Sequence, residues 1–363
     1  MEMINRRKFV KGLGTLAAAA CLLPEEIEAA GTKRRKKKRL WKGFNLLNKF
    51  NPDYQTPFEE EDFEIMAEWG FNFARIPLSY WCWSKENDWY HVDEKCLKEI
   101  DKVVELGKQY NIHINLNFHR TPGYCINPPH EKMNLFEDEE PLNACVYHWK
   151  LFAERYRACS SDDLSFNLLN EAPSIADEKY DKVVRRLIKA IRDVSPKRTI
   201  IVDGLDVGGR PLMTLTDEKN IIQSGRGYQP MLISHYAANW VYGDKPMYFP
   251  KEQLSWPLHE GDKIYDKEWM RTIMNKNWTP WMAQNGKVHI GEFGCHNQTP
   301  HAVALAWLND LLQLFEENQW GWALWNLKGS FGVLDSERTD VVYEHYKGHK
   351  LDRRMLELLR KMQ

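Results

Sequence analysis

After residue 40, short apolar segments alternate with longer segments in which apolar positions recur every three or four residues. The short segments are β-prone and stop abruptly at polar residues, which is typical of buried parallel strands. Eight of them are predicted as strands, at 41–46, 72–76, 112–118, 164–169, 199–202, 231–234, 287–290 and 321–325.

The longer segments have the pattern of amphipathic helices. Within 93–109, for example, Leu97, Ile100 and Val104 share one side of the helix. Helices are predicted at 57–69, 93–109, 142–158, 177–194, 266–285, 302–318 and 350–361, and a weak one at 217–223.

Strands that alternate with helices pair in parallel through right-handed crossovers. The eight alternations therefore predict an α/β fold, a single (β/α)8 TIM barrel that occupies residues 40–363. An open doubly wound sheet fits less well, because no glycine-rich phosphate loop follows the first strand.

Two of the predicted strands end at a glutamate. Glu171 follows the run at 164–169, and Glu292 follows the run at 287–290. The carboxyl ends of barrel strands are where active sites form, and a carboxylate pair is the usual requirement of glycoside hydrolysis. The alternative is that both glutamates are ion-paired structural residues.

Polar side chains also stand at the other strand ends, although inward barrel positions favour branched apolar residues. Asp203 is interpreted as structural, because Asp203-Gly204 suits a turn. The remaining strand ends carry Asn45, Arg75, His119, Arg120, Asn170, His235, Tyr236, Trp325 and Asn326.

Five motifs occur in order at these ends: Arg75-Ile-Pro77, Asn117-Phe-His119, Leu169-Asn170-Glu171, Ile290-Gly-Glu292-Phe-Gly294 and Ala323-Leu-Trp325. Through them, most of residues 40–363 resembles glycoside hydrolase family 5, a family of retaining enzymes. The resemblance implies that Glu171 is the acid/base and Glu292 the nucleophile. It further implies substrate-binding or supporting roles for Arg75, His119, Asn170, His235, Tyr236 and Trp325.

The chemistry of the two roles sets different requirements. A nucleophile must be ionised, so Glu292 needs cations or donors beside it, which Arg75 and Tyr236 can supply. An acid must keep its proton near neutral pH, so Glu171 needs a poorly solvated place near another anion. In a retaining enzyme the two carboxyl groups lie about 5–5.5 Å apart.

Two features depart from the family pattern. The family usually has Asn-Glu-Pro, whereas here Ala172 stands between Glu171 and Pro173, which changes the loop but keeps the acid. Many members space the strand-six His and Tyr by one residue, whereas His235 and Tyr236 are adjacent. Only one of these two residues is therefore expected to take its family role.

Charge and aromatic content indicate which binding partners to expect. The net charge is −1, but residues 1–40 hold 11 basic and 4 acidic residues, so the rest of the chain is acidic and nucleic acid is not expected as a partner. Exposed indoles can serve as platforms for sugars. The candidates in loop-like or polar contexts are Trp81, Trp83, Trp89, Trp240, Trp256 and Trp278.

The seven cysteines are scattered and form no C-x-x-C motif, so we expect buried free thiols. Disulfide bonds are the alternative. There is no H-E-x-x-H or H-x-H motif, and we expect no metal and no cofactor. We also expect no integral membrane segment and a monomer.

Residues 1–30 have the anatomy of a signal peptide, with a basic segment, a short apolar run and small residues at 29–30. Arg6-Arg7 resembles the twin-arginine signal, which implies bacterial export to the periplasm or beyond. An amphipathic helix and lipid anchoring at Cys21 are the alternatives. Residues 31–39 are predicted to form a disordered basic linker.

Together these features predict a secreted retaining hydrolase of β-linked glycans, with an endo-β-1,4-glucanase as first choice. A β-mannanase or an exo-acting β-glucosidase is the alternative on the same fold, since the segments at 120–139 and 237–265 are long enough to close a pocket. A non-catalytic glycan-binding protein and a metal-dependent hydrolase using His119 and His235 are the other classes.

The export hypothesis predicts that changing Arg6 and Arg7 together to Lys leaves the precursor in the cytoplasm, because the twin-arginine receptor reads that pair. Fractionation of expressing cells measures the outcome. Unaltered export of the double-lysine form would contradict the hypothesis.

Overall fold

The computed structural model describes residues 39–363 except 86 and 245. The predicted signal peptide at 1–30 lies outside the described residues, and so does the predicted linker apart from Arg39. Export through Arg6-Arg7 and lipidation at Cys21 therefore stay predictions.

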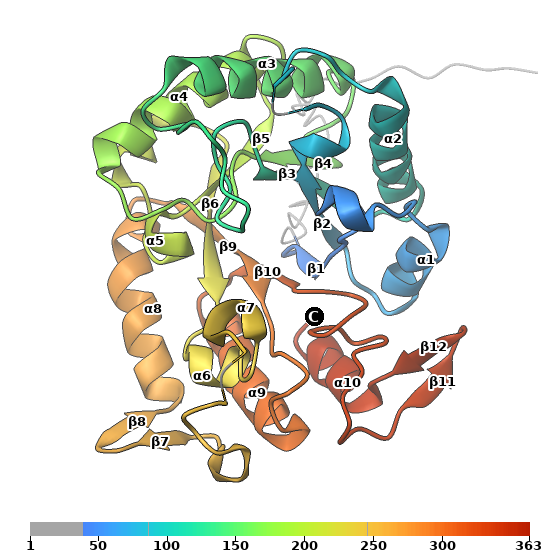
Figure 1. Ribbon diagram of the computed structural model, residues 1–363, viewed down its shortest axis with the longest axis vertical. Coiled ribbons are helices and arrows are strands. Elements are labelled where there is room, and N and C mark those ends of the chain that lie inside the picture. The colour runs from blue at the N-terminus through green and yellow to red at the C-terminus, as the bar shows by residue number, and fades with distance from the viewer. Residues whose placement is uncertain (1–38, 86, 245) are drawn as a thin grey trace, which may run out of the picture. The chain divides into compact units, whose positions relative to one another are not determined.

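Within residues 40–363, eight parallel strands close into one barrel with helices around it (Figure 1). Strand β1 closes the barrel, because Gly43 is paired with Phe73 of β2 and with Ala323 of β10. The predicted single (β/α)8 barrel is confirmed. In order around the barrel the strands are β1 (Lys42–Asn45), β2 (Phe73–Ser79), β3 (His113–Arg120), β4 (Leu164–Asn167), β5 (Thr199–Asp203), β6 (Ile221–Gly227), β9 (Lys287–Phe293) and β10 (Gly321–Leu324).

The long helices cover the barrel with their apolar sides. In α4, the buried Tyr180, Val184, Leu187 and Ile191 recur at the spacing of one helix face. Each predicted long helix is confirmed to within three residues at either end. They are α1 (Glu60–Glu68), α2 (Glu94–Gln109), α3 (Glu139–Arg155), α4 (Asp177–Arg192), α8 (Lys267–Met282), α9 (His301–Glu317) and α10 (Arg353–Lys361).

Smaller elements decorate the loops. Two antiparallel hairpins join β7 (Leu258–Glu260) to β8 (Lys263–Tyr265) and β11 (Glu344–Tyr346) to β12 (His349–Leu351). The short helices are α5 (Leu205–Gly208), α6 (Met231–Ser234), α7 (Asn239–Tyr242), η1 (Pro52–Tyr54), η2 (Tyr80–Cys82), η3 (Met213–Asp217) and η4 (Lys251–Gln253).

The predicted sixth strand is wrong. Residues 231–234 form α6, and the sixth barrel strand is β6, which overlaps the stretch predicted as a weak helix. The apolar run of β6 is short because Gln223 and Ser224 are buried in place of apolar residues, and Gln223 exchanges hydrogen bonds of 2.7 and 2.9 Å with the main chain of Leu212. Its glycines are needed for packing, since a Cβ at Gly227 would lie 2.8 Å from Phe293 Cβ.

The barrel interior is more polar than expected. Near the amino-terminal ends of the strands, the buried His113 stacks on Trp41 with ring centres 3.8 Å apart. His113 Nε2 and Asn115 Nδ2 both bond to Ser165 Oγ, at 2.8 and 2.9 Å. Burial lowers the pKa of the neighbouring His289 to about 3, so this ring is neutral. Polar side chains are tolerated here because most of them bond to one another.

Several tryptophans proposed as platforms are core residues. Trp83, Trp89 and Trp278 are buried, and Trp83 Nε1 donates to His148 Nδ1 at 3.2 Å. Trp81 and Trp256 are half-buried, whereas Trp240 is 60% exposed. Only the last of these remains a clear candidate for an open platform among the described residues.

The six described cysteines are free thiols, and Cys159 alone among them is not buried. In the part of the chain from 39 onward that is described, none of the helices has the length and hydropathy that crossing a membrane requires.

Candidate active site

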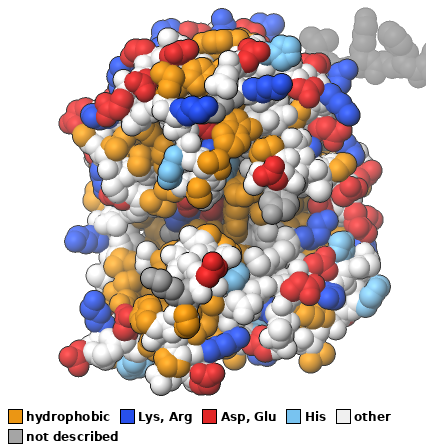
Figure 2. Space-filling view, viewed as in Figure 1, with side chains coloured by type: hydrophobic (Ala, Val, Ile, Leu, Met, Phe, Trp, Pro, Cys, Tyr) orange, Lys and Arg blue, Asp and Glu red, His pale blue; other side chains and the backbone are white. Residues whose placement is uncertain are grey.

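The carboxyl ends of β2, β4, β5, β6 and β9 bring charged side chains together at one mouth of the barrel. Figure 2 shows this face of the molecule hollowed near its middle, above α7 and over β9 and β10, with apolar side chains along the hollow. Glu171 and Glu292 both belong to the cluster, as predicted from the strand ends.

A bulge in β9 directs Glu292 into this cluster. The pairing of β6 with β9 shifts between Gly225 and Arg226, so that Gly291 is skipped and Arg226 lies opposite Glu292. A Cβ at Gly291 would lie 2.6 Å from Ser224 Oγ and 3.0 Å from Arg226 Nη1. Glycine is therefore needed where the bulge re-aims the next side chain.

The Glu292 carboxylate is surrounded by donors and is almost fully buried. Arg75 Nη1 donates to Oε1 at 2.7 Å, and the Tyr228 hydroxyl donates to Oε2 at 3.2 Å. Arg226 Nη2 lies 3.3 Å from Oε1. Burial and the charge of Glu292 raise the pKa of Tyr228 well above its usual range, so its hydroxyl stays a donor. Two cations and one hydroxyl therefore face the two oxygens of this carboxylate.

Arg75 is held rigidly by a set of amides. Its Nη1 also donates to Asn45 Oδ1 at 3.0 Å, its Nε to Asn167 Oδ1 at 3.0 Å, and its Nη2 to Asn170 Oδ1 at 2.8 Å. Burial lowers the pKa of Arg75, and the charge of Glu292 counteracts this effect. The predicted support of the nucleophile by Arg75 therefore has a direct geometric basis.

Glu171 is in a different environment. Its side chain is 14% exposed, compared with 5% for Glu292, so it can be reached from the mouth. Arg226 Nε donates to its Oε1 at 3.1 Å, and Asn170 Nδ2 donates to Oε2 at 3.3 Å. Burial and the charge of Glu292 raise its pKa to about 7, although Arg226 acts in the opposite direction. Such a group can both give and take a proton near neutral pH.

The main chain of Glu171 adopts the left-handed conformation, with φ of 50°. Two contacts hold it there: its N–H donates to Asp203 Oδ2 at 2.8 Å, and its carbonyl accepts from the Tyr124 hydroxyl at 2.6 Å. The extra residue Ala172 is accommodated next to it, where its carbonyl accepts from Val207 N–H at 2.9 Å. These contacts offset a conformation that costs a non-glycine residue about 1–2 kcal/mol.

Asp203 has a larger role than the predicted turn. It is fully buried, and it accepts from Asn167 Nδ2 at 2.9 Å, from the Glu171 N–H and from Arg226 Nη2. Its contribution is structural, as predicted, but it acts inside the charged cluster, where it anchors both the main chain of Glu171 and the side chain of Arg226.

His119 and Trp325 form one wall of the site. Their rings are stacked with centres 5.6 Å apart, and Phe50 contacts both rings edge-on. His119 Nε2 lies 3.3 Å from Asn170 Nδ2 and 3.2 Å from Asn127 Nδ2. Burial, together with Arg75 and Arg226, keeps the pKa of His119 well below its usual range, so the ring is neutral. Trp325 is half-buried and keeps part of its surface open.

The expected contact of Tyr236 with Glu292 is wrong. The Tyr236 hydroxyl donates to the Phe249 carbonyl at 2.8 Å, and Tyr228 takes the place beside Glu292. His235 packs edge-on against Tyr228 with ring centres 4.7 Å apart, and burial lowers the pKa of His235 to about 4. His235 thus packs against the tyrosine that contacts Glu292. The error follows from the wrong sixth strand, because β6 ends at Gly227 rather than near 234.

Arg226 was missed for the same reason. Its Nη2 donates to Asn170 Oδ1 at 2.7 Å and to Asp203, and its Nη1 donates to Ser224 Oγ at 3.1 Å. A signal was present in the sequence: Arg226-Gly-Tyr228 has the one-residue spacing usual for the strand-six pair, with arginine in place of histidine. Tyr124 and Asn127 carried no such signal, because they lie in the loop after β3.

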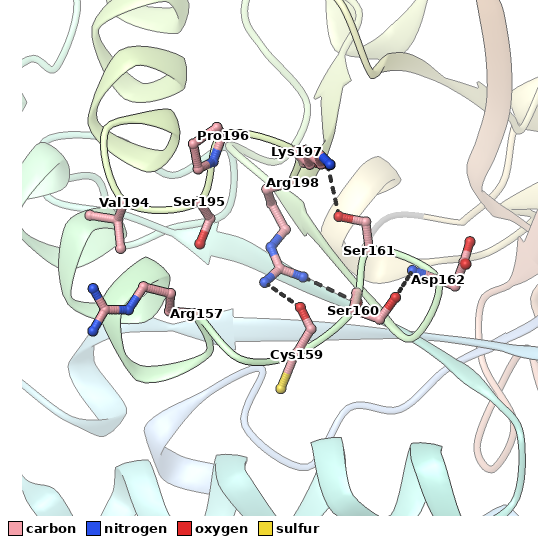
Figure 3. Close-up of a pocket in the computed structure, with 10 residues that line it drawn as sticks. All are labelled: Arg157, Cys159, Ser160, Ser161, Asp162, Val194, Ser195, Pro196, Lys197 and Arg198. Atoms are coloured by element: carbon pink, nitrogen blue, oxygen red, sulfur yellow. Dashed lines mark hydrogen bonds between the residues drawn. The ribbon is translucent and has the colours of Figure 1, made fainter.

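A second cavity, of about 500 Å³, lies next to the loops that precede β4 and β5, away from the carboxyl ends of these strands (Figure 3). Arg198 crosses it and donates to the main-chain carbonyls of Tyr156, Cys159, Ser160 and Leu164 at 2.9–3.3 Å. The guanidinium thus ties the two loops together. At the amino-terminal face of a barrel, such a residue is expected to serve stability.

Comparison with known proteins adds independent information. The family model for Cellulase (glycosyl hydrolase family 5) matches residues 32–330. Endoglucanase C of Acetivibrio thermocellus is 25% identical over 311 residues, which is 80% of this chain and 90% of that protein. Cellodextrinase A of Ruminococcus flavefaciens is 23% identical over 267 residues, with 72% and 75% covered.

Solved structures similar to this chain are also glycoside hydrolases. A crystal structure of a glycoside hydrolase is 37% identical to this chain, with a TM-score of 0.83. The match covers 90% of this chain and 100% of that one. Endoglucanase Cel5A from Thermotoga maritima is 25% identical with a TM-score of 0.70, covering 88% of this chain and 96% of that one.

We expect the Glu171 carboxyl to titrate near pH 7, and we expect Glu292→Gln to lower its pKa by about one unit or more, because the substitution removes a nearby negative charge. Carbon-13 NMR of labelled glutamate side chains measures both values. Glu344→Gln, on the β11–β12 hairpin, is the control and should leave the titration unchanged. An unchanged pKa in the Glu292→Gln protein would mean that the two carboxyls do not interact.

Proposed function

Because the chain belongs to glycosyl hydrolase family 5, it hydrolyses glycosidic bonds, and we propose that it does so as a retaining endo-β-1,4-glucanase that uses two glutamates. The observation that carries the proposal is the contrast between the two carboxyls. Glu292 is surrounded by donors that favour its charged form, whereas the pKa of Glu171 is raised to about 7.

In the proposed first step, a Glu292 oxygen attacks the anomeric carbon while Glu171 gives its proton to the glycosidic oxygen. The bond to the leaving sugar breaks, the leaving sugar departs as an alcohol, and a glycosyl ester on Glu292 remains. In the second step Glu171 takes a proton from water, whose oxygen attacks the same carbon. The ester bond breaks, which restores the Glu292 carboxylate and the protonated Glu171.

The surrounding residues support these roles. Arg75 and Tyr228 bond to different oxygens of Glu292 and so fix the plane of its carboxylate. Asn170 Nδ2 lies 3.3 Å from both His119 Nε2 and Glu171 Oε2, which are long bonds that a sugar hydroxyl can replace. We assign Asn170 and His119 to the binding of the sugar whose bond breaks, with Trp325 beneath it.

The choice of glucan rests on the relatives and on the aromatic residues at the mouth. The endoglucanase relatives match most of the chain. Trp240 is 60% exposed and packs against His235, His296 and Phe331. It provides an open aromatic ring in addition to the wall formed by Trp325 and Phe50. Aromatic faces on two sides suit a chain of several sugars.

Exo action on short β-glucans is the second candidate. The cellodextrinase relative and the elaborated segment between β6 and α8, which contains α6, α7 and the β7–β8 hairpin, both favour it. The structure does not favour a glycan-binding protein without activity, because both glutamates have hydrogen-bond partners suited to catalysis. We also propose that the enzyme is exported, on the basis of the signal at 1–30.

Substitution of each glutamate separates their roles. Glu292→Ala should reduce turnover of every substrate by several orders of magnitude, because no covalent intermediate can form. Glu171→Ala should reduce turnover of natural glycans strongly but spare the first step on an aryl glycoside with an acidic phenol. Added azide should then give the β-glycosyl azide with Glu171→Ala and the α-azide with Glu292→Ala.

Product stereochemistry and turnover are measured together, with Glu344→Ala as a remote control. The opposite pair of azides would exchange the two roles. Undiminished turnover in both variants would exclude this site as the active site.

On carboxymethyl cellulose, endo action should lower viscosity while few reducing ends have appeared. The same measurement on mixed-linkage glucan, xyloglucan, mannan and an aryl β-glucoside ranks the substrates, and we expect β-1,4-glucans to rank above mannan. A steady release of reducing sugar with little loss of viscosity would support the exo candidate instead, and a preference for mannan would support a β-mannanase.

A further inference from the structure

Arg226 touches both glutamates of the site. Its Nε donates to Glu171 Oε1 at 3.1 Å, and its Nη2 lies 3.3 Å from Glu292 Oε1. The same Nη2 donates to Asn170 Oδ1 at 2.7 Å and to Asp203. One guanidinium therefore spans the acid, the nucleophile and the amide between them.

The arginine is fixed on its strand. Its Nη1 donates to Ser224 Oγ and to the Gly225 carbonyl, both at 3.1 Å, and its side chain is 5% exposed. Gly208 leaves room for it, because a Cβ there would lie 2.8 Å from Arg226 Cγ. The guanidinium is thus held by bonds within its own strand, and Gly208 of α5 lies close to the aliphatic part of the side chain.

The net charge of the five ionisable groups in the cluster is zero when Glu171 is protonated. Arg75 and Arg226 then carry two positive charges against the two negative charges of Asp203 and Glu292. In the proposed first step Glu292 becomes a neutral ester and Glu171 loses its proton to the leaving sugar. The total stays the same, but one negative charge has moved from Glu292 to Glu171.

Arg75 and Arg226 differ in their relation to this movement. Arg75 bonds to Glu292 and to three amides, so it pairs with the charge at the start of the step. Arg226 is already bonded to Glu171 as well as close to Glu292, so it is adjacent to the charge before and after. No side-chain movement is needed to follow the charge from one carboxyl to the other.

We propose that Arg226 is a positioning residue that stays paired with the migrating negative charge in both half-reactions and keeps Glu171 and Glu292 aligned throughout. The inference rests on the proposed double displacement. It adds a role for an arginine at the end of β6 that serves both chemical steps rather than one.

Several groups face Glu171 and determine its titration. Arg226 of β6 lowers its pKa, whereas Glu292 of β9 and Asp203 of β5 raise it, in addition to the effect of burial. Asn170 bonds to its carboxyl and Tyr124 to its carbonyl, and both are neutral groups. The two charges bonded to each other, Arg226 and Asp203, therefore act on Glu171 with opposite signs.

This opposition gives a test that a purely structural role would fail. Arg226→Met should raise the pKa of Glu171 and move the alkaline limb of kcat/KM up by about one pH unit. Asp203→Asn keeps an acceptor for the Glu171 N–H but removes the negative charge, so the alkaline limb should move down. Lower activity in both variants with an unchanged pH profile would overturn the proposal.

The second readout compares leaving groups. Arg226→Met should lower kcat/KM at the optimal pH by about 10²–10³-fold on cello-oligosaccharides, the size expected for loss of a preorganised donor. Because Arg226 serves both steps, turnover of an activated aryl cellobioside, whose second step limits the rate, should fall as well. A loss restricted to the poor leaving groups would reduce Arg226 to an aid for proton donation and overturn the proposal.

Two further variants serve as controls for effects on folding. Arg226→Lys keeps the positive charge but cannot span both glutamates, so the alkaline limb should stay near its original pH while turnover falls. The double variant Arg226→Met with Asp203→Asn removes the buried charge pair together and should melt at a higher temperature than Arg226→Met alone. Recovery of turnover along with stability in the double variant would show that Arg226 only balances Asp203.

The proposed function and this inference fail in different experiments. If Glu171→Ala and Glu292→Ala leave activity intact, the proposed function is wrong. If those substitutions abolish activity but the Arg226 and Asp203 variants shift the alkaline limb in the same direction or not at all, the two-glutamate mechanism stands and the role of Arg226 does not.

Discussion

Two guanidinium groups buried among three carboxyls set the conditions for the rest of this site. Charges removed from water are stable only when each is paired and hydrogen-bonded. Arg75 and Arg226 compensate Asp203 and Glu292, and Glu171 shares Arg226 with both of these carboxyls. A proton that is retained near pH 7 is the consequence of this balance, together with burial.

The polar interior of the barrel follows from the need to hold those charges still. Asn45, Asn167 and Asn170 accept from Arg75, and Asn45 in turn donates to the Gly291 carbonyl at 3.0 Å in the bulge before Glu292. Amides suit this task because each offers an acceptor to the arginine and still has donors, which Asn45 and Asn167 direct to the main chain and Asn170 to the side chains of His119 and Glu171. The same amides would be costly in an ordinary apolar barrel core, where they would lack partners.

Around the charged centre the mouth is aromatic. His119, Trp325 and Phe50 make one wall, and His235, Trp240, His296 and Phe331 make another. The histidines whose pKa is lowered by burial, His119 and His235, add hydrogen-bonding capacity without adding charge, so the balance at the centre is undisturbed.

The sequence by itself determined the barrel, seven of its eight strands, the long helices and both glutamates, because these depend on local periodicity and on apolar runs that end at a charged residue. Only the tertiary structure located β6, since its buried Gln223 and Ser224 find partners on other segments and leave a weak local signal. The location of β6 in turn showed that Arg226 contacts Glu171 and that Tyr228, rather than Tyr236, contacts Glu292. The role of Asp203 and the burial of Trp83, Trp89 and Trp278 were decided in the same way, because hydrogen bonds and burial join residues far apart in the chain.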